Sequence, residues 1–110
     1  MKSIYLAGPY AHKKPSVREW RFNKLNQIAG ELMRDFGYIV FSPISHSHPI
    51  SLHIGNSISN EFWLRQDRFY MNLCDEMWVA MLPGWKQSNG IKYETWYFRV
   101  SGKPVNYLIV

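Results

Sequence analysis

The sequence has 110 residues and a mass of 13.0 kDa, so we expect a single domain over residues 1–110. Its 46% of hydrophobic and 19% of charged residues exclude a disordered or fibrous chain, and no apolar run reaches the roughly 20 residues of a membrane span. The net charge of +5 arises from Lys and Arg scattered along the chain, which argues against a nucleic-acid partner and favours a small phosphorylated ligand.

Cysteine usage indicates the compartment. Cys74 is the single cysteine, which excludes an intramolecular disulfide and any multi-cysteine metal site. The chain enters an apolar, strand-like run at once, without the basic, apolar and small-residue regions of a signal peptide. We therefore expect a cytoplasmic protein that has no membrane partner.

The first part of the chain predicts a strand, a helix and a second strand. Residues 3–7 form an apolar run without alternation, which is typical of a strand buried on both faces. A helix follows, with Ser16 as its expected N-cap, Glu19 three residues later as in a capping box, and Gly37 as its stop. Residues 38–41 form the second strand.

A polar stretch over residues 42–57 interrupts this pattern. Pro43, Pro49 and Gly55 break it, so we expect a loop. A loop of this length in a compact domain is uncommon and usually functional.

The second part of the chain predicts a helix, a strand, a helix and a last strand. Ser59 is the expected cap of the first of these helices, and the third strand follows over residues 77–82. Ser88 or Asn89 begins the next helix, and residues 105–110 form the fourth strand.

The order of these elements predicts an α/β fold, a three-layer Rossmann-like (flavodoxin-like) domain with a four-stranded parallel sheet in the order 2-1-3-4. In such sheets ligands bind outside the carboxyl ends of the strands, near the switch point between strands 1 and 3. Three loops meet that edge, over residues 8–14, 42–57 and 82–89. We therefore expect the functional residues in these loops and in the helix turns that follow them.

The first loop combines a glycine with basic side chains. Gly8 allows the backbone to approach a ligand, and the next helix offers its N-terminus to an anion beside His12 and Arg18. The loop is neither a Walker motif nor a Gly-x-Gly-x-x-Gly fingerprint, which argues against nucleoside triphosphate hydrolysis and dinucleotide redox chemistry. A plain turn with solvated lysines is an equally good interpretation.

Three histidines lie within eight residues of the second loop, namely His46, His48 and His53. They could bind a metal, but no cysteine or carboxylate lies within the loop to complete the ligand set, so we expect neither a metal nor another cofactor. A polar pocket is the better interpretation, with His46 in contact with phosphate or sugar. Plain solvation of the three rings is the alternative.

Two carboxylates in the predicted helices stand out. Asp67 lies among aromatic residues, and Glu94 follows the start of the third predicted helix. If both face the strand ends, they form a pair suited to glycosyl chemistry. Spacing alone favours the alternative, two solvated helix charges. Ordinary surface charges are expected at Glu19, Glu31 and Glu76.

Four short motifs follow one another along the chain. They are the IYLAGPY run of residues 4–10, the pair Asp67 and Asp75, the segment 90–94 with its glycine and glutamate, and the Gly-Lys-Pro-Val run of residues 102–105. Together they resemble the nucleoside 2-deoxyribosyltransferases and their relatives, the 2′-deoxynucleoside 5′-phosphate N-hydrolases. The His-rich stretch 42–49 is similar to one in small phage-associated proteins of that superfamily, and for a phage-encoded chain the location would be the host cytoplasm.

The resemblance implies roles for individual residues. Glu94 would attack the anomeric carbon of a deoxyribosyl group, Asp67 would handle the proton of the leaving base or hold the sugar, and Tyr10 would lie near the sugar or orient Glu94. The expected substrate-binding residues are Gly8, Pro9, His12, Arg18, His46, Ser88, Asn89 and Gly90. Many transferases of the family carry Asp-Ser-Gly where this chain has Ser-Asn-Gly, so a carboxylate that contacts the base is missing.

The implied function is that of an N-glycosidase or deoxyribosyltransferase. It would cleave the N-glycosidic bond of a 2′-deoxynucleoside 5′-monophosphate through a covalent glycosyl-glutamate, by hydrolysis or by transfer of the sugar to another base. An NAD or ADP-ribose glycohydrolase and a non-catalytic nucleotide-sensing module are the alternatives. The expected partners are a small nucleotide or nucleoside and further copies of the chain. We expect a homodimer or a higher homo-oligomer, because four strands with many aromatic residues leave apolar surface to cover.

Overall fold

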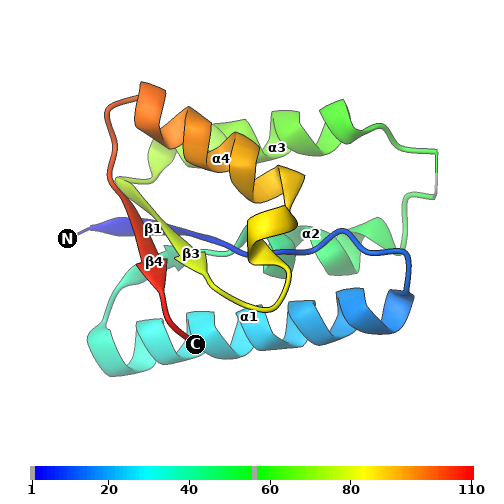
Figure 1. The fold of residues 1–110 in the computed structure, drawn as a ribbon, viewed down its shortest axis with the longest axis horizontal. Coiled ribbons are helices and arrows are strands. Elements are labelled where there is room, and N and C mark those ends of the chain that lie inside the picture. The colour runs from blue at the N-terminus through cyan, green and yellow to red at the C-terminus, as the bar shows by residue number, and fades with distance from the viewer. Residues whose placement is uncertain (1, 56) are drawn as a thin grey trace.

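The structure, a computed structural model, describes residues 2–55 and 57–110 (Figure 1). Its elements in chain order are β1 (Ser3–Ala7), α1 (Pro15–Phe36), β2 (Ile39–Phe41), α2 (Pro43–Ser51), α3 (Asn60–Leu73), β3 (Glu76–Ala80), the 3₁₀ turn η1 (Trp85–Gln87), α4 (Asn89–Val100) and β4 (Val105–Leu108). The strands pair in parallel as one sheet in the order β2-β1-β3-β4. The predicted α/β class, the parallel sheet and the strand order are therefore confirmed.

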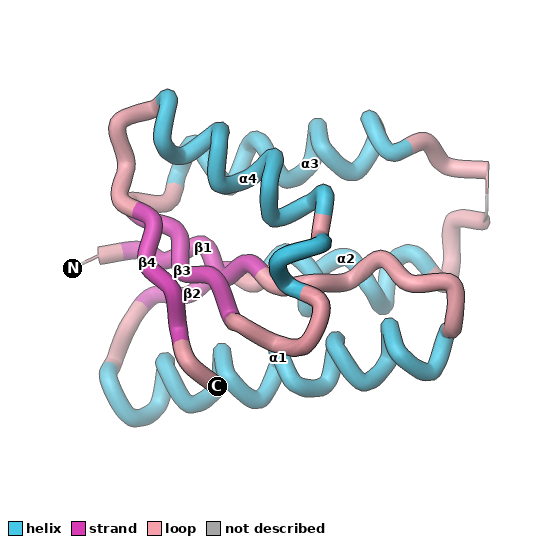
Figure 2. Tube along the Cα trace, in the orientation of Figure 1, coloured by secondary structure: helices cyan, strands magenta, loops and turns pink. Residues whose placement is uncertain are grey.

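Helices cover both faces of this sheet (Figures 1 and 2). α3 and α4 lie along one face, α1 lies along the other, and α2 packs against α1 and β1. Successive side chains of β1 point to opposite faces, so Tyr5 joins the apolar cluster on the α3 and α4 side while Leu6 joins the cluster on the α1 side. Both residues are fully buried, which explains why β1 is apolar without alternation. No helix in the described part of the chain is long and apolar enough to span a membrane.

The prediction for α1 is confirmed at its C-terminal end and wrong at its N-terminal end. Gly37 adopts a left-handed conformation with φ of 68°, and its N–H bonds to carbonyls of the last helical turn, as a C-terminal stop requires. At the other end Lys14 is the N-cap residue and Pro15 the first helical residue, so the prediction that Ser16 caps the helix is wrong. Proline suits this first position because its missing N–H would have no partner there.

The predicted loop over residues 42–57 is wrong in its first half, where α2 forms. Pro43 occupies the first helical position, which proline tolerates, and Pro49 lies near the other end. Ile44 packs against the apolar cluster on the α1 side, and His48, one turn later, is buried. The four-residue spacing of Ile44 and His48 is typical of one face of a helix, but the two prolines make this stretch look like a loop in the sequence.

The second part of the chain follows the prediction closely. The hydroxyls of Ser59 and Ser88 each accept a hydrogen bond of 3.2 Å from the N–H three residues later, so both serines cap their helices as expected. β3 ends at Ala80 rather than at residue 82 because the chain turns sharply there, with a hydrogen bond of 2.8 Å from the Leu82 N–H to the Ala80 carbonyl. β4 ends at Leu108 rather than at residue 110.

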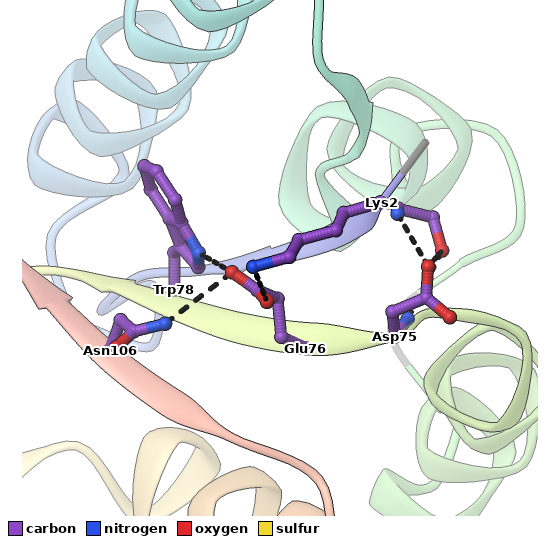
Figure 3. A network of polar contacts seen from close by, with 6 residues as sticks. Lys2, Asp75, Glu76, Trp78 and Asn106 are labelled. Atoms are coloured by element: carbon purple, nitrogen blue, oxygen red, sulfur yellow. Dashed lines mark hydrogen bonds and ion pairs between the residues drawn. The ribbon is translucent and has the colours of Figure 1, made fainter.

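Glu76, which the sequence placed among ordinary surface charges, is buried at the start of β3 (Figure 3). Its carboxylate accepts hydrogen bonds of 2.6 Å from Trp78 Nε1 and 3.4 Å from Asn106 Nδ2, and it lies 3.4 Å from Lys2 Nζ. These contacts join the amino-terminal parts of the strands. They belong to the framework and lie at the amino-terminal end of the strands, opposite the carboxyl-terminal end where the ligand site is predicted.

Two residues of the family-like motifs also belong to the framework. Asp75 accepts a hydrogen bond of 2.8 Å from the Ser3 N–H, which joins the start of β3 to β1. Lys103 Nζ donates hydrogen bonds of 2.7 to 3.0 Å to three main-chain carbonyls at the end of α3, those of Met71, Asn72 and Cys74. The Gly-Lys-Pro run therefore supplies a cation where the carbonyls of a helix end need one.

Candidate active site

A buried carboxylate on α4 forms the centre of the site. Ser88 caps α4 directly after the turn that follows β3, which places Glu94 in the second turn of the helix, facing the sheet. Glu94 is 8% exposed, and its Oε2 atom accepts a hydrogen bond of 2.6 Å from the hydroxyl of Tyr5, a fully buried residue of β1. The interpretation of Glu94 as a solvated helix charge is therefore wrong.

Asp67 of α3 faces the same region. Burial raises the pKa of Asp67 to about 6. Burial also raises the pKa of Glu94 to about 8; the hydrogen bond from Tyr5 opposes this rise, and the negative charge of Asp67 adds to it. Burial and then the charges of both carboxylates raise the pKa of the Tyr5 hydroxyl well above its ordinary value. The three groups thus form one electrostatically coupled set, which holds a proton on Glu94 at neutral pH.

An aromatic wall adjoins this set. The rings of Phe41 and Tyr70 stack with centroids 3.9 Å apart, and the His46 ring lies 5.6 Å from Phe41 and 5.7 Å from Tyr70. Phe41 in turn lies 6.1 Å from the ring of Tyr5, which bonds Glu94. His46 is therefore linked to Tyr5 through ring contacts with Phe41, and Phe41 and Tyr70 are two aromatic residues that the sequence analysis did not select.

The first loop is held by arginines of α1. Arg18 donates to the His12 carbonyl, and Arg21 donates to the carbonyls of Tyr10 and Ala11 at 3.3 and 3.1 Å and to that of Pro83 at 3.2 Å. Arg21, which the sequence analysis missed, thereby joins the loops that follow β1 and β3. Loss of hydration and then the neighbouring cations lower the pKa of His12, because positive charge is concentrated at this loop.

Gly8 and Pro9 pack inside the molecule. A Cβ atom on Gly8 would lie 2.6 Å from a Cδ atom of Leu25, a fully buried residue of α1. The missing side chain of Gly8 thus allows α1 to approach the end of β1, a packing role that the sequence analysis did not anticipate. Pro9 is fully buried beside it.

Tyr10 does not contact Glu94. Its hydroxyl lies 2.6 Å from Nδ1 of His48, and Nε2 of the same ring lies 2.7 Å from a carboxylate oxygen of Glu19. The hydroxyl that orients Glu94 belongs to Tyr5, so this part of the expectation for Tyr10 is wrong. Glu19, expected to be an ordinary surface charge, has a specific partner.

Residues 88–90, which precede Glu94, form the start of α4. The Ser88 hydroxyl accepts from the Ile91 N–H, and Asn89 is the first helical residue. A Cβ atom on Gly90 would meet only the Ser88 hydroxyl oxygen, at an ordinary contact distance of 3.7 Å. No steric demand therefore explains Gly90, and residues 88–90 lie four to six residues before Glu94, at the start of α4.

A separate open groove of about 850 Å³ lies between α1 and the end of β4, lined by residues such as Trp20, Lys24, Trp85 and Ile109. Glu94 and Asp67 are not among its lining residues. We assign the candidate site to the carboxylates, because perturbed titratable groups at the switch point of a parallel sheet indicate chemistry, whereas an open groove indicates contact surface. Within residues 2–55 and 57–110, histidine, cysteine and carboxylate side chains form no group of three or more that could hold a metal ion.

Comparison with known proteins agrees with this fold. The chain matches the family DUF1937, described as a domain of unknown function, over residues 2–109. It is similar to the solved structure of a 2-deoxyribosyltransferase from the psychrotolerant bacterium Bacillus psychrosaccharolyticus, with 23% identity, a TM-score of 0.64, and coverage of 98% of this chain and 76% of that chain. No curated protein matches the sequence. At this identity the likeness shows a shared fold.

Proposed function

The chain belongs to DUF1937, a nucleoside deoxyribosyltransferase-like family, and from that premise we propose that it cleaves the N-glycosidic bond of a 2′-deoxynucleoside 5′-monophosphate. The observation that carries the proposal is the buried Glu94, held by Tyr5 and coupled to Asp67, in the helix that follows β3. A carboxylate and a nearby acid are the two groups that glycosyl transfer requires.

In the first step Glu94 acts as the nucleophile. One carboxylate oxygen attacks the anomeric carbon, the bond from that carbon to the base nitrogen breaks, and the base leaves with the bonding electrons and takes a proton from the Asp67 carboxyl group. The deoxyribosyl group is then esterified to Glu94. Division of one difficult displacement into two easier ones is the gain of covalent catalysis.

In the second step water releases the sugar. Water transfers a proton to the Asp67 carboxylate while its oxygen attacks the same carbon, and the bond to Glu94 breaks and regenerates the carboxylate. A second base in place of water gives deoxyribosyl transfer instead of hydrolysis. The same two residues serve both outcomes, so the acceptor decides between them.

The protonation state of Glu94 and Asp67 limits the fraction of the free enzyme that can react. The first step needs the proton on Asp67, whereas the pKa values of about 8 for Glu94 and about 6 for Asp67 place it on Glu94. Because the pKa of Glu94 is the higher of the two, only a minority fraction of the free enzyme holds the reactive arrangement. A cation or hydrogen-bond donor brought near Glu94 by the substrate would increase this fraction.

The first loop favours a phosphorylated substrate. His12, Lys13 and Lys14 precede the N-terminus of α1, where backbone N–H groups and the helix dipole attract anions. Arg18 and Arg21 hold the carbonyls of this loop, so its shape is kept while the lysines remain available to a 5′-phosphate. We therefore place the 5′-phosphate at residues 12–14 and the sugar toward Glu94.

The test is a base-release assay by chromatography. The protein is incubated with the four deoxynucleoside monophosphates, the free deoxynucleosides and NAD, next to Glu94→Gln and to the control Glu31→Gln, which alters an exposed glutamate of α1. We expect free base from a monophosphate with the wild type and Glu31→Gln but not with Glu94→Gln. Mass spectrometry of acid-quenched samples should find the deoxyribosyl phosphate on the peptide that contains Glu94. Release from NAD alone, or from none of them, would refute the proposal.

A further inference from the structure

Two short hydrogen bonds join Tyr10, His48 and Glu19. The Tyr10 hydroxyl lies 2.6 Å from His48 Nδ1, and His48 Nε2 lies 2.7 Å from a Glu19 carboxylate oxygen. The imidazole is 7% exposed, whereas the Glu19 side chain is 56% exposed. The chain of contacts therefore runs from the loop after β1, through a buried ring, to a carboxylate at the surface.

The imidazole ring is held on its faces as well as at its two nitrogens. The centroid of the Phe22 ring lies 4.3 Å from that of His48, with 30° between the planes, and the Tyr10 ring approaches edge-on at 5.5 Å. Glu19 and Phe22 are three residues apart on α1, so they share one face of that helix. The position of the ring in α2 is thereby fixed by α1.

The hydrogen bonds have a defined direction while the imidazole is neutral. The ionised Glu19 carboxylate can only accept, so Nε2 of His48 carries the proton and Nδ1 is the acceptor. The Tyr10 hydroxyl must then donate to Nδ1. Its oxygen, whose only hydrogen is engaged, can then act only as an acceptor toward a ligand beside the loop.

We propose that Glu19 and His48 are positioning residues that fix Tyr10 as a hydrogen-bond acceptor for a hydroxyl group of the sugar. This inference rests on the proposed function, which places the 5′-phosphate at residues 12–14 and the sugar toward Glu94, so that the sugar would pass Tyr10 of the same loop. A 2′-deoxynucleoside 5′-monophosphate has one free sugar hydroxyl, the 3′-hydroxyl, so Tyr10 would select substrates that carry it. A phosphate oxygen, which only accepts, would be disfavoured at the same place.

The test compares 2′-deoxy- with 2′,3′-dideoxynucleoside 5′-monophosphates. We expect wild-type kcat/KM to be roughly 10-fold or more in favour of the substrate with the 3′-hydroxyl, the usual scale for one hydrogen bond in a dry site. Tyr10→Phe and Glu19→Ala should each abolish this preference, whereas Glu19→Gln should retain it because its amide oxygen still accepts from Nε2. Tyr107→Phe, which alters a hydroxyl on β4, is the control.

A double variant tests whether Glu19 acts only by positioning Tyr10 or has an independent role. Tyr10→Phe combined with Glu19→Ala should be no worse than Tyr10→Phe alone, because Glu19 acts through Tyr10. Additive losses, or a preference that survives Tyr10→Phe, would overturn the inference.

Two further readouts need no turnover. In ¹⁵N spectra of the histidine ring we expect His48 to carry its proton on Nε2, to lose this fixed tautomer in Glu19→Ala and to shift at Nδ1 in Tyr10→Phe. A proton on Nδ1 would overturn the inference. If the wild type cleaves neither nucleotide, the proposed function fails, and the dissociation constants of the two nucleotides replace kcat/KM. Equal wild-type constants would then overturn the role of Tyr10.

Discussion

Tyr5 and Glu94, 89 residues apart in the chain, share a hydrogen bond of 2.6 Å in which the phenol on β1 donates to the carboxylate of α4. Burial raises the pKa of both groups, whereas this bond favours the ionised carboxylate. Tyr5 therefore partly offsets the effect of burial and keeps Glu94 closer to the ionised form that a nucleophile needs.

The substitution Tyr5→Phe tests this relationship. The ring keeps its packing and only the hydroxyl is lost, so the pKa of Glu94 should rise further above its present value of about 8. The activity at pH 7 should fall roughly 10-fold for each unit of that rise. The measurement is kcat/KM against pH, with Tyr107→Phe as control. A profile identical to that of the wild type would show that the bond has no electrostatic effect on Glu94.

The substitution Glu94→Gln should stabilise the protein in a pH-dependent manner. The folded-state pKa of Glu94 is raised from the ordinary 4.5 to about 8, so its contribution to stability is fully present below 4.5 and is lost as pH rises toward 8. Glutamine does not ionise and can still accept from Tyr5. Urea unfolding should show equal stability of variant and wild type near pH 4 and a growing advantage of the variant up to pH 8. An advantage independent of pH would contradict the assigned burial of the charge.

The activity should show a bell-shaped dependence on pH. One proton shared by Glu94 and Asp67 predicts apparent limbs near 6 and 8 in kcat/KM. Asp67→Asn should lower the rate by about 100-fold or more, remove the descending limb and leave an ascending limb that reports Glu94 alone. Gln66→Asn, a neighbouring change on α3, should leave the bell intact. A descending limb that survives Asp67→Asn would assign the acid to another residue.

Lys103→Met should destabilise the fold without a direct effect on the site. The ammonium group donates to three carbonyls at the end of α3, and methionine keeps the apolar part of the side chain. We expect a loss of about 1–3 kcal/mol in the free energy of unfolding by urea, the range for hydrogen bonds to a charged group. Lys86→Met, which removes a lysine from the turn after β3, should cost less than about 0.5 kcal/mol. Equal effects of the two substitutions would exclude a specific role for Lys103.

Local patterns in the sequence determined most of the fold. Helix caps act within three residues, which is why Ser59, Ser88 and Gly37 could be placed from the sequence. Apolar runs separated by helices imply parallel strands with right-handed crossovers, and from that rule the strand order followed. The same local reasoning does not predict α2, because Pro43 and Pro49 indicate breaks in the sequence, although in the structure one occupies the tolerated first position and the other lies near the helix end.

The sequence by itself determined which chemical groups the chain carries near the strand ends: a glutamate, an aspartate and a cluster of basic residues. Only the tertiary structure decided their partners and their charge. Tyr5 rather than Tyr10 bonds Glu94, His48 bonds Glu19, and Glu76 is buried, because these contacts join residues on different elements whose approach depends on helix packing. A pKa likewise depends on the water removed by that packing, which no local pattern records.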